Sequence, residues 1–300
     1  MKLIPVAEHP LVSVIVPTFR DNNRLAKLID ALEKQTFDKE NYEVIIVNND
    51  SDDDIADSFA SALPSNFMIL TEPKPGSYAA RNTGIRYSKG LITGFTDSDC
   101  LPAKDWIEVA ANFLLANTEY SRLAGNVILS YREKIPGIME LYDSVYSFRQ
   151  ERNALRGTSV TANMFCYRNL FEKVGLFDEL FMSGQDFAWG RKAADLGFEI
   201  KYLEELVVLH PARNNFSELV KKARRIEGGK NKIKKRLKKR LRYLIKLLSP
   251  PISQWEKNYR DLKGISFFKK SQLLLLRYLI NLIRAVEFIR LNLIFKPDRN

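Results

Sequence analysis

Four short apolar runs constrain the fold of this chain more than any other feature of its sequence. They cover residues 11–16, 42–47, 67–70 and 91–95, and they alternate with stretches whose apolar residues recur at helical spacing. Strands that are apolar along nearly their whole length are typical of sheets covered on both faces. The pattern therefore predicts an α/β fold in which a mostly parallel, Rossmann-like sheet is flanked by helices.

Polar side chains gather directly after these runs. Thr18 and Arg20 follow the first run, Asp50 follows the second, and Asp97 and Asp99 follow the fourth. In open parallel sheets, ligands bind beyond the carboxyl ends of the strands. We therefore expect these five side chains to line one binding site.

The triplet Asp97–Ser98–Asp99 is suited to holding a cation. Two carboxylates at a strand exit can face one Mg2+ or Mn2+ ion, and that ion can neutralise a diphosphate leaving group. Two acids in a surface turn are often only solvated, but the preceding segment adds Gly76, which permits close backbone approach, and Arg81, which can pair with a phosphate or a carboxylate. Together they predict a site for a metal ion and a diphosphate.

The pattern becomes mixed after residue 100. Apolar spacing predicts helices over 105–117 and 186–196, and a further helix that follows residue 167 and ends at residue 174. It also predicts strands over 123–130 and 207–209. Between them lies a long aromatic segment, 139–148, to which the pattern assigns no element.

Seven motifs follow one another over roughly residues 11 to 212. They are VSVIVPTF at 12–19, VNNDSDD at 47–53, GSYAARNTGI at 76–85, TDSDC at 96–100, ANMFCYRNLFEKVGLFDE at 162–179, GQDFAWGRKAADLGF at 184–198 and VLHPAR at 208–213. Each motif is unspecific by itself, but the series in this order resembles the inverting glycosyltransferases of family 2, which have the nucleotide-binding GT-A fold. The resemblance implies an enzyme that uses a nucleotide-sugar donor.

The resemblance implies which residues bind this donor, expected to be a UDP-sugar. Pro17, Thr18 and Arg20 would line the nucleotide pocket, Asp50 would hydrogen-bond the uracil or the ribose, and Arg81 would steady the base or the diphosphate. The whole set implied for nucleotide-sugar binding is Pro17, Thr18, Arg20, Asp50, Gly76, Arg81, Asp97, Ser98 and Asp99.

The resemblance also implies a metal site that holds Mn2+ or Mg2+. Asp97 would contact the ribose and a metal-bound water, Asp99 would ligate the cation, and His210 would complete the site. A lone histidine beside Pro211 can equally be structural, so both interpretations of His210 stay open.

Asp186 resembles the family's general base, which deprotonates the acceptor hydroxyl for direct displacement with inversion. The family usually has Glu at the position of Gln185 and often another acid at that of Ala188. Gln185 can still hold an acceptor hydroxyl, because an amide both donates and accepts hydrogen bonds. On spacing alone, Asp186 at a helix start would equally be interpreted as complementing the helix dipole.

Charge divides the chain into two unlike parts. The net charge is +11, but residues 1–210 carry 22 Lys and Arg against 30 Asp and Glu, while the last 90 residues carry 25 against 6. Together with the resemblance, this division implies a GT-A domain at 1–212, with a nucleotide-binding half at 1–100 and an acceptor half at 101–212. A basic amphipathic helical region would follow at 213–300.

Two C-terminal segments have the pattern of amphipathic helices. The segment 230–248 is basic and carries apolar residues on one face at Ile233, Leu237, Leu241, Leu244, Ile245 and Leu248. The segment 273–295 carries a polar stripe at Arg277, Asn281, Arg284, Glu287 and Arg290, which argues against a spanning helix. An anionic membrane surface, packing on the catalytic domain and a homo-oligomer contact all stay open as partners. Nucleic acid is disfavoured, because only Tyr243 in the first segment is available for base stacking.

Compartment and function follow from these observations. The sequence starts without a signal-peptide or transit-peptide pattern, and two cysteines, Cys100 and Cys166, cannot build a disulfide framework. We expect a cytoplasmic protein, peripheral at the cytoplasmic face of the membrane, that moves a sugar to a lipid-linked or polysaccharide hydroxyl. The alternative is a noncatalytic membrane-surface interaction protein on the same scaffold, which the missing acids at Gln185 and Ala188 motivate. A nucleotidyltransferase would be expected to have a glycine-rich loop after the first run, where PTFRDNN stands.

Overall fold

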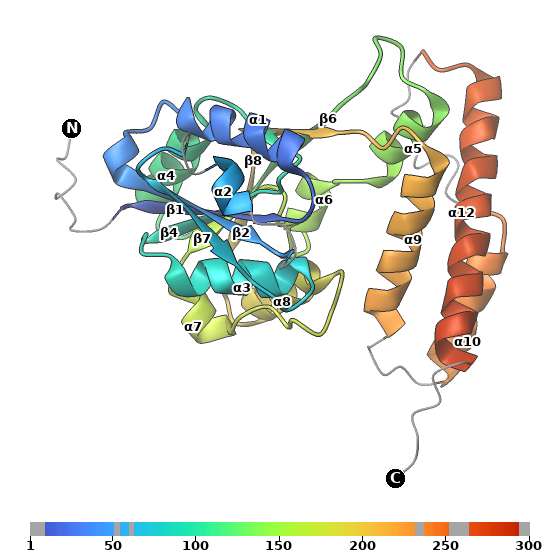
Figure 1. The fold of residues 1–300 in the computed structure, drawn as a ribbon. Helices are drawn as coiled ribbons and strands as arrows, with labels where there is room; N and C mark the ends of the chain where they lie inside the picture. The colour runs from blue at the N-terminus through green and yellow to red at the C-terminus, as the bar shows by residue number, and fades with distance from the viewer. Residues whose placement is uncertain (1–9, 51–54, 60–62, 232–236, 252–263, 294–300) are drawn as a thin grey trace. The chain divides into compact units, whose positions relative to one another are not determined.

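The computed structural model describes residues 10–50, 55–59, 63–231, 237–251 and 264–293 (Figure 1). The chain forms two compact units, and each is described by itself. The first unit consists of Met1–Ile128, Arg149–Leu180 and Gln185–His210, and the second consists of Leu129–Phe148, Phe181–Gly184 and Pro211–Asn300. The second unit therefore includes two internal stretches of sequence as well as the basic C-terminal region.

One mixed sheet of eight strands forms the centre of the first unit, in the order β3-β2-β1-β4-β7-β6-β8-β5. The strands are β1 (Val12–Thr18), β2 (Tyr42–Asn48), β3 (Phe67–Thr71), β4 (Ile92–Phe95), β5 (Leu101–Pro102), β6 (Arg122–Ser130), β7 (Met164–Tyr167) and β8 (Ile200–Pro211). β1 is parallel to β2 and β4, and β3 is parallel to β2. β7 is antiparallel to β4 and β6, and β5 is antiparallel to β8. The four predicted runs are confirmed as the parallel half, and the later strands make the sheet mixed.

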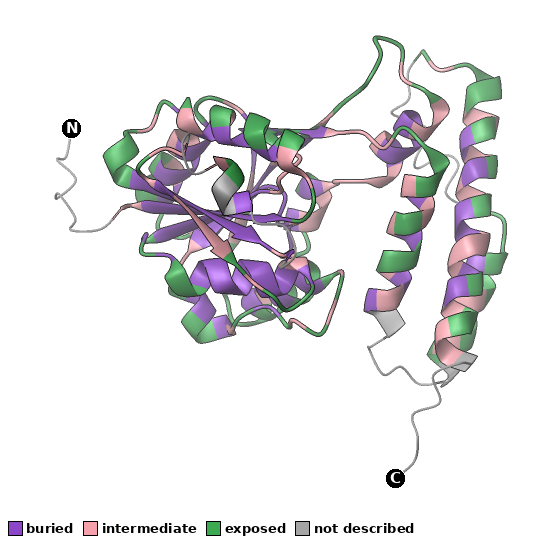
Figure 2. Ribbon diagram, viewed as in Figure 1, coloured by how far each residue is buried: buried purple, intermediate pink, exposed green. Residues whose placement is uncertain are grey.

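Helices cover both faces of this sheet. They are α1 (Asn22–Glu33), the 3-10 helix η1 (Lys39–Asn41), α2 (Ile55–Phe59), α3 (Ser77–Tyr87), α4 (Trp106–Ala116), α6 (Gln150–Ala154), α7 (Leu170–Val174) and α8 (Gln185–Asp195). α1 lies on one face, and α3 and α8 lie on the other (Figure 1). α1 packs through apolar residues at helical spacing, which are buried, while its outer side stays exposed (Figure 2).

An aromatic cluster fixes α8 against the sheet. The cluster buries four aromatic side chains together: Phe95 of β4, Phe171 of α7, Phe177 of the segment after α7, and Trp189 of α8. The Phe171 and Trp189 rings stack with centroids 5.0 Å apart, and Phe95 meets Phe177 edge-on at 5.9 Å. Because aromatic pairs in such geometries stabilise beyond their buried area, this cluster sets the position of the helix that begins at Gln185.

A fully buried arginine braces the same helix. The Arg122 guanidinium donates to the backbone carbonyls of Phe198, Gly157 and Gly190, with Nη1 lying 3.0 Å from each of the two glycine oxygens. Burial lowers the pKa of Arg122 to about 10. A single side chain of β6 thus joins the segment before β8, the turn at Gly157 and the middle of α8.

The second unit is a group of helices. They are α5 (Ile138–Tyr146), α9 (Phe216–Asn231), α10 (Leu237–Leu248) and α12 (Phe267–Leu293). α12 packs against α5, α9 and α10. Its apolar core joins residues of α5 and α9 to residues of α12, among them Leu141, Leu219, Leu273 and Ile280. The aromatic segment 139–148 therefore belongs with the C-terminal helices, which the sequence did not indicate.

Both predicted C-terminal helices are present, with different bounds. α10 covers the second part of the predicted 230–248 segment, and α12 starts six residues before the predicted 273–295 segment. Ile233 of the predicted apolar face lies outside the described residues.

Buried polar groups hold the C-terminal helices together. Glu227 of α9 accepts hydrogen bonds from Arg284 Nε of α12 at 2.7 Å and from the Tyr243 hydroxyl of α10 at 2.7 Å. Arg284 Nη2 also donates to the Tyr243 hydroxyl at 2.8 Å. A buried charge is tolerated only when it is paired and hydrogen-bonded. These three side chains therefore specify how α9, α10 and α12 pack.

The polar stripe predicted on the last helix faces this group of helices. Asn281 and Glu287 are buried and Arg284 bonds Glu227, whereas Leu275 is 68% exposed and Val286 is 66% exposed. α12 thus turns an apolar side outward. None of the described helices has the combination of length and apolarity that crossing a bilayer requires.

The role of Arg122 as an internal brace is testable by substitution. Replacing Arg122 by Met leaves three buried carbonyl groups without this donor, so we expect the free energy of unfolding in urea to fall by about 2–4 kcal/mol. Arg168→Met is the matched control, because half-buried Arg168 donates through Nε to the Gly90 carbonyl alone, and it should cost less than about 1 kcal/mol. Equal losses for the two variants would contradict the assignment.

Candidate functional site

The carboxyl ends of β1 and β2 lie side by side. Thr18 pairs in register with Asn48, and the Asn49 amide donates to the Thr18 carbonyl at 2.9 Å. Thr18 and Pro17 end a strand that is buried along its whole length. The Thr18 hydroxyl oxygen is buried and has no hydrogen-bond partner among the described residues. A buried polar atom of this kind is a place where a ligand or a water binds.

The structure brings Arg20 and Asp50 together at this edge. Arg20 Nε donates to Asp50 Oδ2, and the backbone of Asp50 is held in turn by the side chain of Asn48. Arg20 has a φ of 51°, in the left-handed region that non-glycine residues seldom adopt. Asp50 is buried, while Arg20 is exposed. The pair presents a solvent-facing guanidinium over a fixed carboxylate.

Gly76 directly precedes α3 and lies beside these residues. Its φ of 124° lies outside the range that side chains favour, and its amide donates to Asn49 Oδ1 at 2.6 Å. One turn later, buried Arg81 donates through Nη2 to Asp97 Oδ1. The Arg81 Nε atom is buried without a hydrogen-bond partner in the part of the chain that the structure describes. Arg81 therefore keeps an unused donor beside the paired carboxylate.

Asp99, Cys100 and His210 form a cluster that could hold a metal ion, with their ligand atoms within 4.8 Å of one another. His210 Nε2 lies 3.5 Å from Asp99 Oδ1. The pairing of β5 with β8, which sets Leu101 opposite Leu209, brings this histidine of β8 next to the Asp-Ser-Asp triplet. The structure thus joins two of the three expected ligands.

Two of the three side chains in this cluster, the carboxylate and the imidazole, are suitable ligands for a divalent cation. A carboxylate oxygen and an imidazole nitrogen are acceptable ligands for Mn2+, whereas a protonated thiol is a poor one. Cys100 is fully buried, and burial raises the pKa of its thiol well above the ordinary value. Asp97 lies outside the cluster among the described residues and bonds Arg81 instead, while half-buried Ser98 stands between the two acids. Asp99 and His210 are therefore the fitting pair.

Asp186 stands at the start of α8 and is buried. Its Oδ1 atom accepts hydrogen bonds from the Tyr78 hydroxyl at 3.1 Å and from the Phe187 amide at 3.0 Å. Its Oδ2 atom has no hydrogen bond to any described residue. Burial raises the pKa of Asp186, while the Phe187 amide and the charge of Arg81 oppose that rise. One oxygen is fixed and the other is available, which suits a group that accepts a proton.

Gln185 precedes this aspartate and is also buried. Its backbone amide donates to the Tyr78 hydroxyl at 3.1 Å, and its side-chain amide makes no hydrogen bond within the described ranges. The side chain is therefore available to a hydroxyl ligand. Ala188, at the other position where an acid was expected, is exposed on α8.

Three residues at this edge escaped the sequence reasoning. Arg24 of α1 lies 3.5 Å from Asp99 Oδ2, Cys100 joins the metal cluster, and Tyr78 holds Asp186. Tyr78 and Cys100 lie within two of the motifs, but their spacing in the sequence does not indicate which residues they contact. For Arg24 the only signal in the sequence is its position near the start of the helix that follows the first strand.

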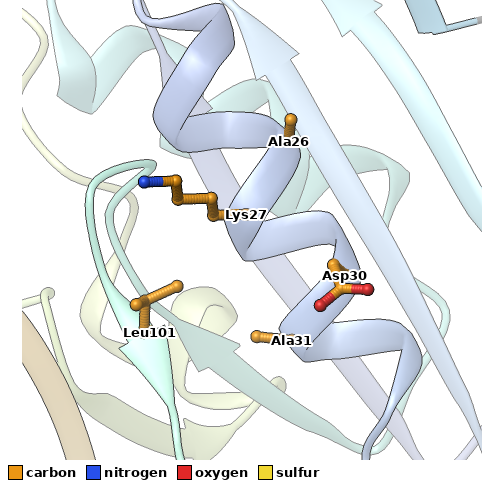
Figure 3. A pocket seen from close by; sticks show the side chains of 5 residues that line it. All are labelled: Ala26, Lys27, Asp30, Ala31 and Leu101. Carbon is orange, nitrogen blue, oxygen red and sulfur yellow. The ribbon is translucent and has the colours of Figure 1, made fainter.

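A shallow hollow lies between α1 and β5, and none of the site residues named above lines it. It is lined by Ala26, Lys27, Asp30, Ala31 and Leu101 (Figure 3). Lys27 and Asp30 point in different directions in this view. Because a ligand site needs convergent polar groups, we assign no ligand to this hollow.

Comparison with known proteins gives a family match. The model of the family described as Glycosyl transferase family 2 matches residues 13–172. Glycosyltransferase AglE of Haloferax volcanii is 34% identical over 224 residues, which cover 73% of this chain and 73% of AglE. A Methanococcus voltae enzyme is 24% identical over 225 residues, covering 70% of each chain. It is named dolichyl N-acetyl-alpha-D-glucosaminyl phosphate 3-beta-D-2,3-diacetamido-2,3-dideoxy-beta-D-glucuronosyltransferase.

Solved structures show the same fold. TarS of S. aureus, residues 1–349, in complex with UDP-GlcNAc is 18% identical with a TM-score of 0.52, covering 93% of this chain and 90% of TarS. The mannosyltransferase PcManGT of Pyrobaculum calidifontis, in complex with GDP-Man and Mn2+, is 19% identical with a TM-score of 0.57. That match covers 95% of this chain and 74% of PcManGT.

Proposed function

Because the chain belongs to glycosyl transferase family 2, we propose that it moves a sugar from a nucleotide-sugar donor to an acceptor hydroxyl with inversion. The observation that carries this proposal is the buried Asp186 carboxylate, which has one oxygen fixed by Tyr78 and the other without a partner among the described residues. Direct displacement needs one such base on the acceptor side. A double displacement would need a second, nucleophilic carboxylate beside the sugar.

The donor binds at the carboxyl ends of β1, β2 and β4. The unpartnered Thr18 hydroxyl, the Arg20–Asp50 pair and the free Nε–H of Arg81 offer donors and acceptors to a nucleotide and its diphosphate. We infer a UDP-sugar, which the likeness to TarS with UDP-GlcNAc supports. A GDP-sugar, as in the PcManGT complex, is the competing outcome.

Asp99 and His210 are the residues that hold the divalent cation, Mn2+ or Mg2+. The cation supplies charge that neutralises the leaving diphosphate. PcManGT was solved with Mn2+. Asp97 keeps Arg81 in place at the same edge, so the two acids of the triplet have separate tasks.

The acceptor is a lipid-linked or glycan hydroxyl. The M. voltae relative carries a dolichyl phosphate-linked sugar in its name. In this chain the buried side chain of Gln185, which precedes Asp186, would hold such a hydroxyl as a neutral donor and acceptor. Family membership and the relatives favour an enzyme over the noncatalytic alternative.

The C-terminal helices seat the enzyme on an anionic membrane at its cytoplasmic face. Leu241, Ile245 and Leu248 form an exposed apolar row on α10, with exposed Arg242 and Lys246 beside it. α12 adds a second outward apolar side, while Asn281 and Glu287 of its polar stripe are buried. An apolar face flanked by cations is the pattern of helices that lie in a membrane interface, where each basic residue contributes about 1 kcal/mol.

The role of Asp186 predicts a large and selective loss of activity. Asp186→Asn should lower turnover by about 10²–10⁴-fold, because the amide cannot accept the acceptor proton. Turnover is measured as nucleotide release from UDP-glucose, UDP-N-acetylglucosamine and GDP-mannose with Mn2+. Asp30→Asn, on exposed α1, is the control and should match the wild type. Unchanged turnover in Asp186→Asn would show that another group is the base.

The metal pair predicts stabilisation by Mn2+ that depends on two side chains. Ligand at a hundred times its Kd adds about 2.7 kcal/mol to the free energy of unfolding, so Mn2+ with UDP should raise the Tm by several degrees. Asp99→Ala and His210→Ala should each remove most of this rise, whereas Cys100→Ser should keep it. A rise that survives in both alanine variants would place the cation elsewhere.

The membrane proposal predicts flotation with anionic vesicles. Changing Leu241, Ile245 and Leu248 together to Ser removes apolar side chains that each contribute about 1 kcal/mol or more when buried in lipid. We expect at least tenfold weaker binding to phosphatidylglycerol vesicles, and little binding of either protein to phosphatidylcholine vesicles. Leu155→Ser, at an exposed leucine of the first unit, is the control. If the triple variant floats normally but loses a dimeric mass in solution, the row is a contact between copies.

A further inference from the structure

Tyr78 links two elements of the first unit through one hydroxyl group. It stands in the first turn of α3 and is 5% exposed. Its oxygen accepts the Gln185 amide at 3.1 Å, and its O–H donates to Asp186 Oδ1 at 3.1 Å. A phenol has one proton to donate and lone pairs to accept with, so both bonds can exist together. The hydroxyl is thereby committed to the start of α8.

The start of α8 needs an acceptor from elsewhere. The first amides of any helix have no partner within it, and a side chain before the helix usually supplies one. Here the residue before Gln185 is Gly184, which has no side chain. Tyr78 takes that place from a different helix, and the Asp186 amide also lies 3.5 Å from its oxygen. The orientation of the Asp186 side chain at the start of α8 therefore depends on Tyr78.

The same helix carries a donor-side residue. Arg81 follows Tyr78 by one turn, lies with its Cζ atom 5.6 Å from the centre of the Tyr78 ring, and bonds Asp97. α3 thus contacts both the residues that we assign to the donor and the carboxylate that we assign to the acceptor. A base must be held within a few tenths of an ångström of its productive position to act efficiently.

We propose that Tyr78 is the positioning residue of the transfer reaction, because it fixes the Asp186 carboxylate relative to the helix that carries Arg81. This inference rests on the proposed role of Asp186 as the base. Tyr78 touches no reacting atom. It holds Oδ1 so that Oδ2 faces the acceptor hydroxyl.

The charges around Asp186 give this role a pH signature. Besides Tyr78, the groups that act on it are the Phe187 amide of its own helix, Arg81 of α3 and Asp97 after β4. Burial raises the pKa of Asp186, and the Tyr78 hydrogen bond is among the effects that hold it down. Burial and the charge of Asp186 raise the pKa of Tyr78 itself, so its hydroxyl stays protonated and able to donate. Loss of that donor raises the pKa of Asp186 further.

Tyr78→Phe tests the proposal, with Tyr42→Phe as a matched control. Tyr42, the first residue of β2, is 1% exposed. Its hydroxyl donates to the Leu32 carbonyl of α1 at 2.8 Å. The base acts only when deprotonated, so turnover falls as the pH drops through the pKa of Asp186. We expect Tyr78→Phe to move this acidic limb up by roughly one pH unit and to lower kcat about tenfold. The donor KM should stay unchanged, and Tyr42→Phe should keep the wild-type limb and kcat.

The outcomes separate this inference from the proposed function. Turnover is nucleotide release from whichever of UDP-glucose, UDP-N-acetylglucosamine and GDP-mannose is hydrolysed fastest. If Asp186→Asn is inactive while Tyr78→Phe keeps the wild-type acidic limb, the positioning role is wrong and the base stands. If Asp186→Asn is fully active, the proposed base is wrong and the inference fails with it.

Thermal unfolding gives a readout that needs no turnover. Only the ionised Asp186 carboxylate gains a charge-assisted hydrogen bond from Tyr78. Tyr78→Phe should therefore lower the Tm more at pH 8 than at pH 4.5, whereas Tyr42→Phe should lower it equally at both. An equal loss at both pH values for Tyr78→Phe would overturn the inference.

Discussion

The close packing of α3 on β1 is the constraint on which the candidate site depends. A Cβ atom at Gly84 would lie 2.5 Å from Ile15 Cγ2, so α3 can approach the strand this closely only with glycine at that position. β1 in turn is held in parallel register between β2 and β4. The helix therefore brings Tyr78 and Arg81 to the edge where three parallel strands end. A larger residue at Gly84 would move both side chains away from Asp97 and Asp186.

The parallel half of the fold was predictable because its signals are local. Each of the four apolar runs carries its own burial pattern, and the helices between them carry theirs. The segment 139–148 could not be placed in this way, because its partners Leu219 and Leu273 are far away in sequence. The same holds for Arg122, whose carbonyl partners lie on three separate segments. Contacts of this kind depend on the folded chain and leave no periodic pattern.

The site shows the same division between local and long-range information. Residues that directly follow strands, such as Asp97 and Asp99, were identified from the strand pattern alone. The family resemblance added His210 and Asp186, which no spacing rule connects to the triplet. The partners of these residues came only from the structure. The register of β5 with β8 sets His210 beside Asp99, and the approach of α3 to α8 sets Tyr78 beside Asp186.

Electrostatic pairing couples the donor and the cation in the proposed reaction. In the chain alone, Asp97 bonds Arg81 and Asp99 lies 3.5 Å from Arg24. A diphosphate can bind the free Nε–H of Arg81 without breaking the pair with Asp97. A cation held by Asp99 and His210 competes with Arg24 for Asp99, and a bound diphosphate offers Arg24 a new negative partner. The donor and the cation should therefore each strengthen the binding of the other.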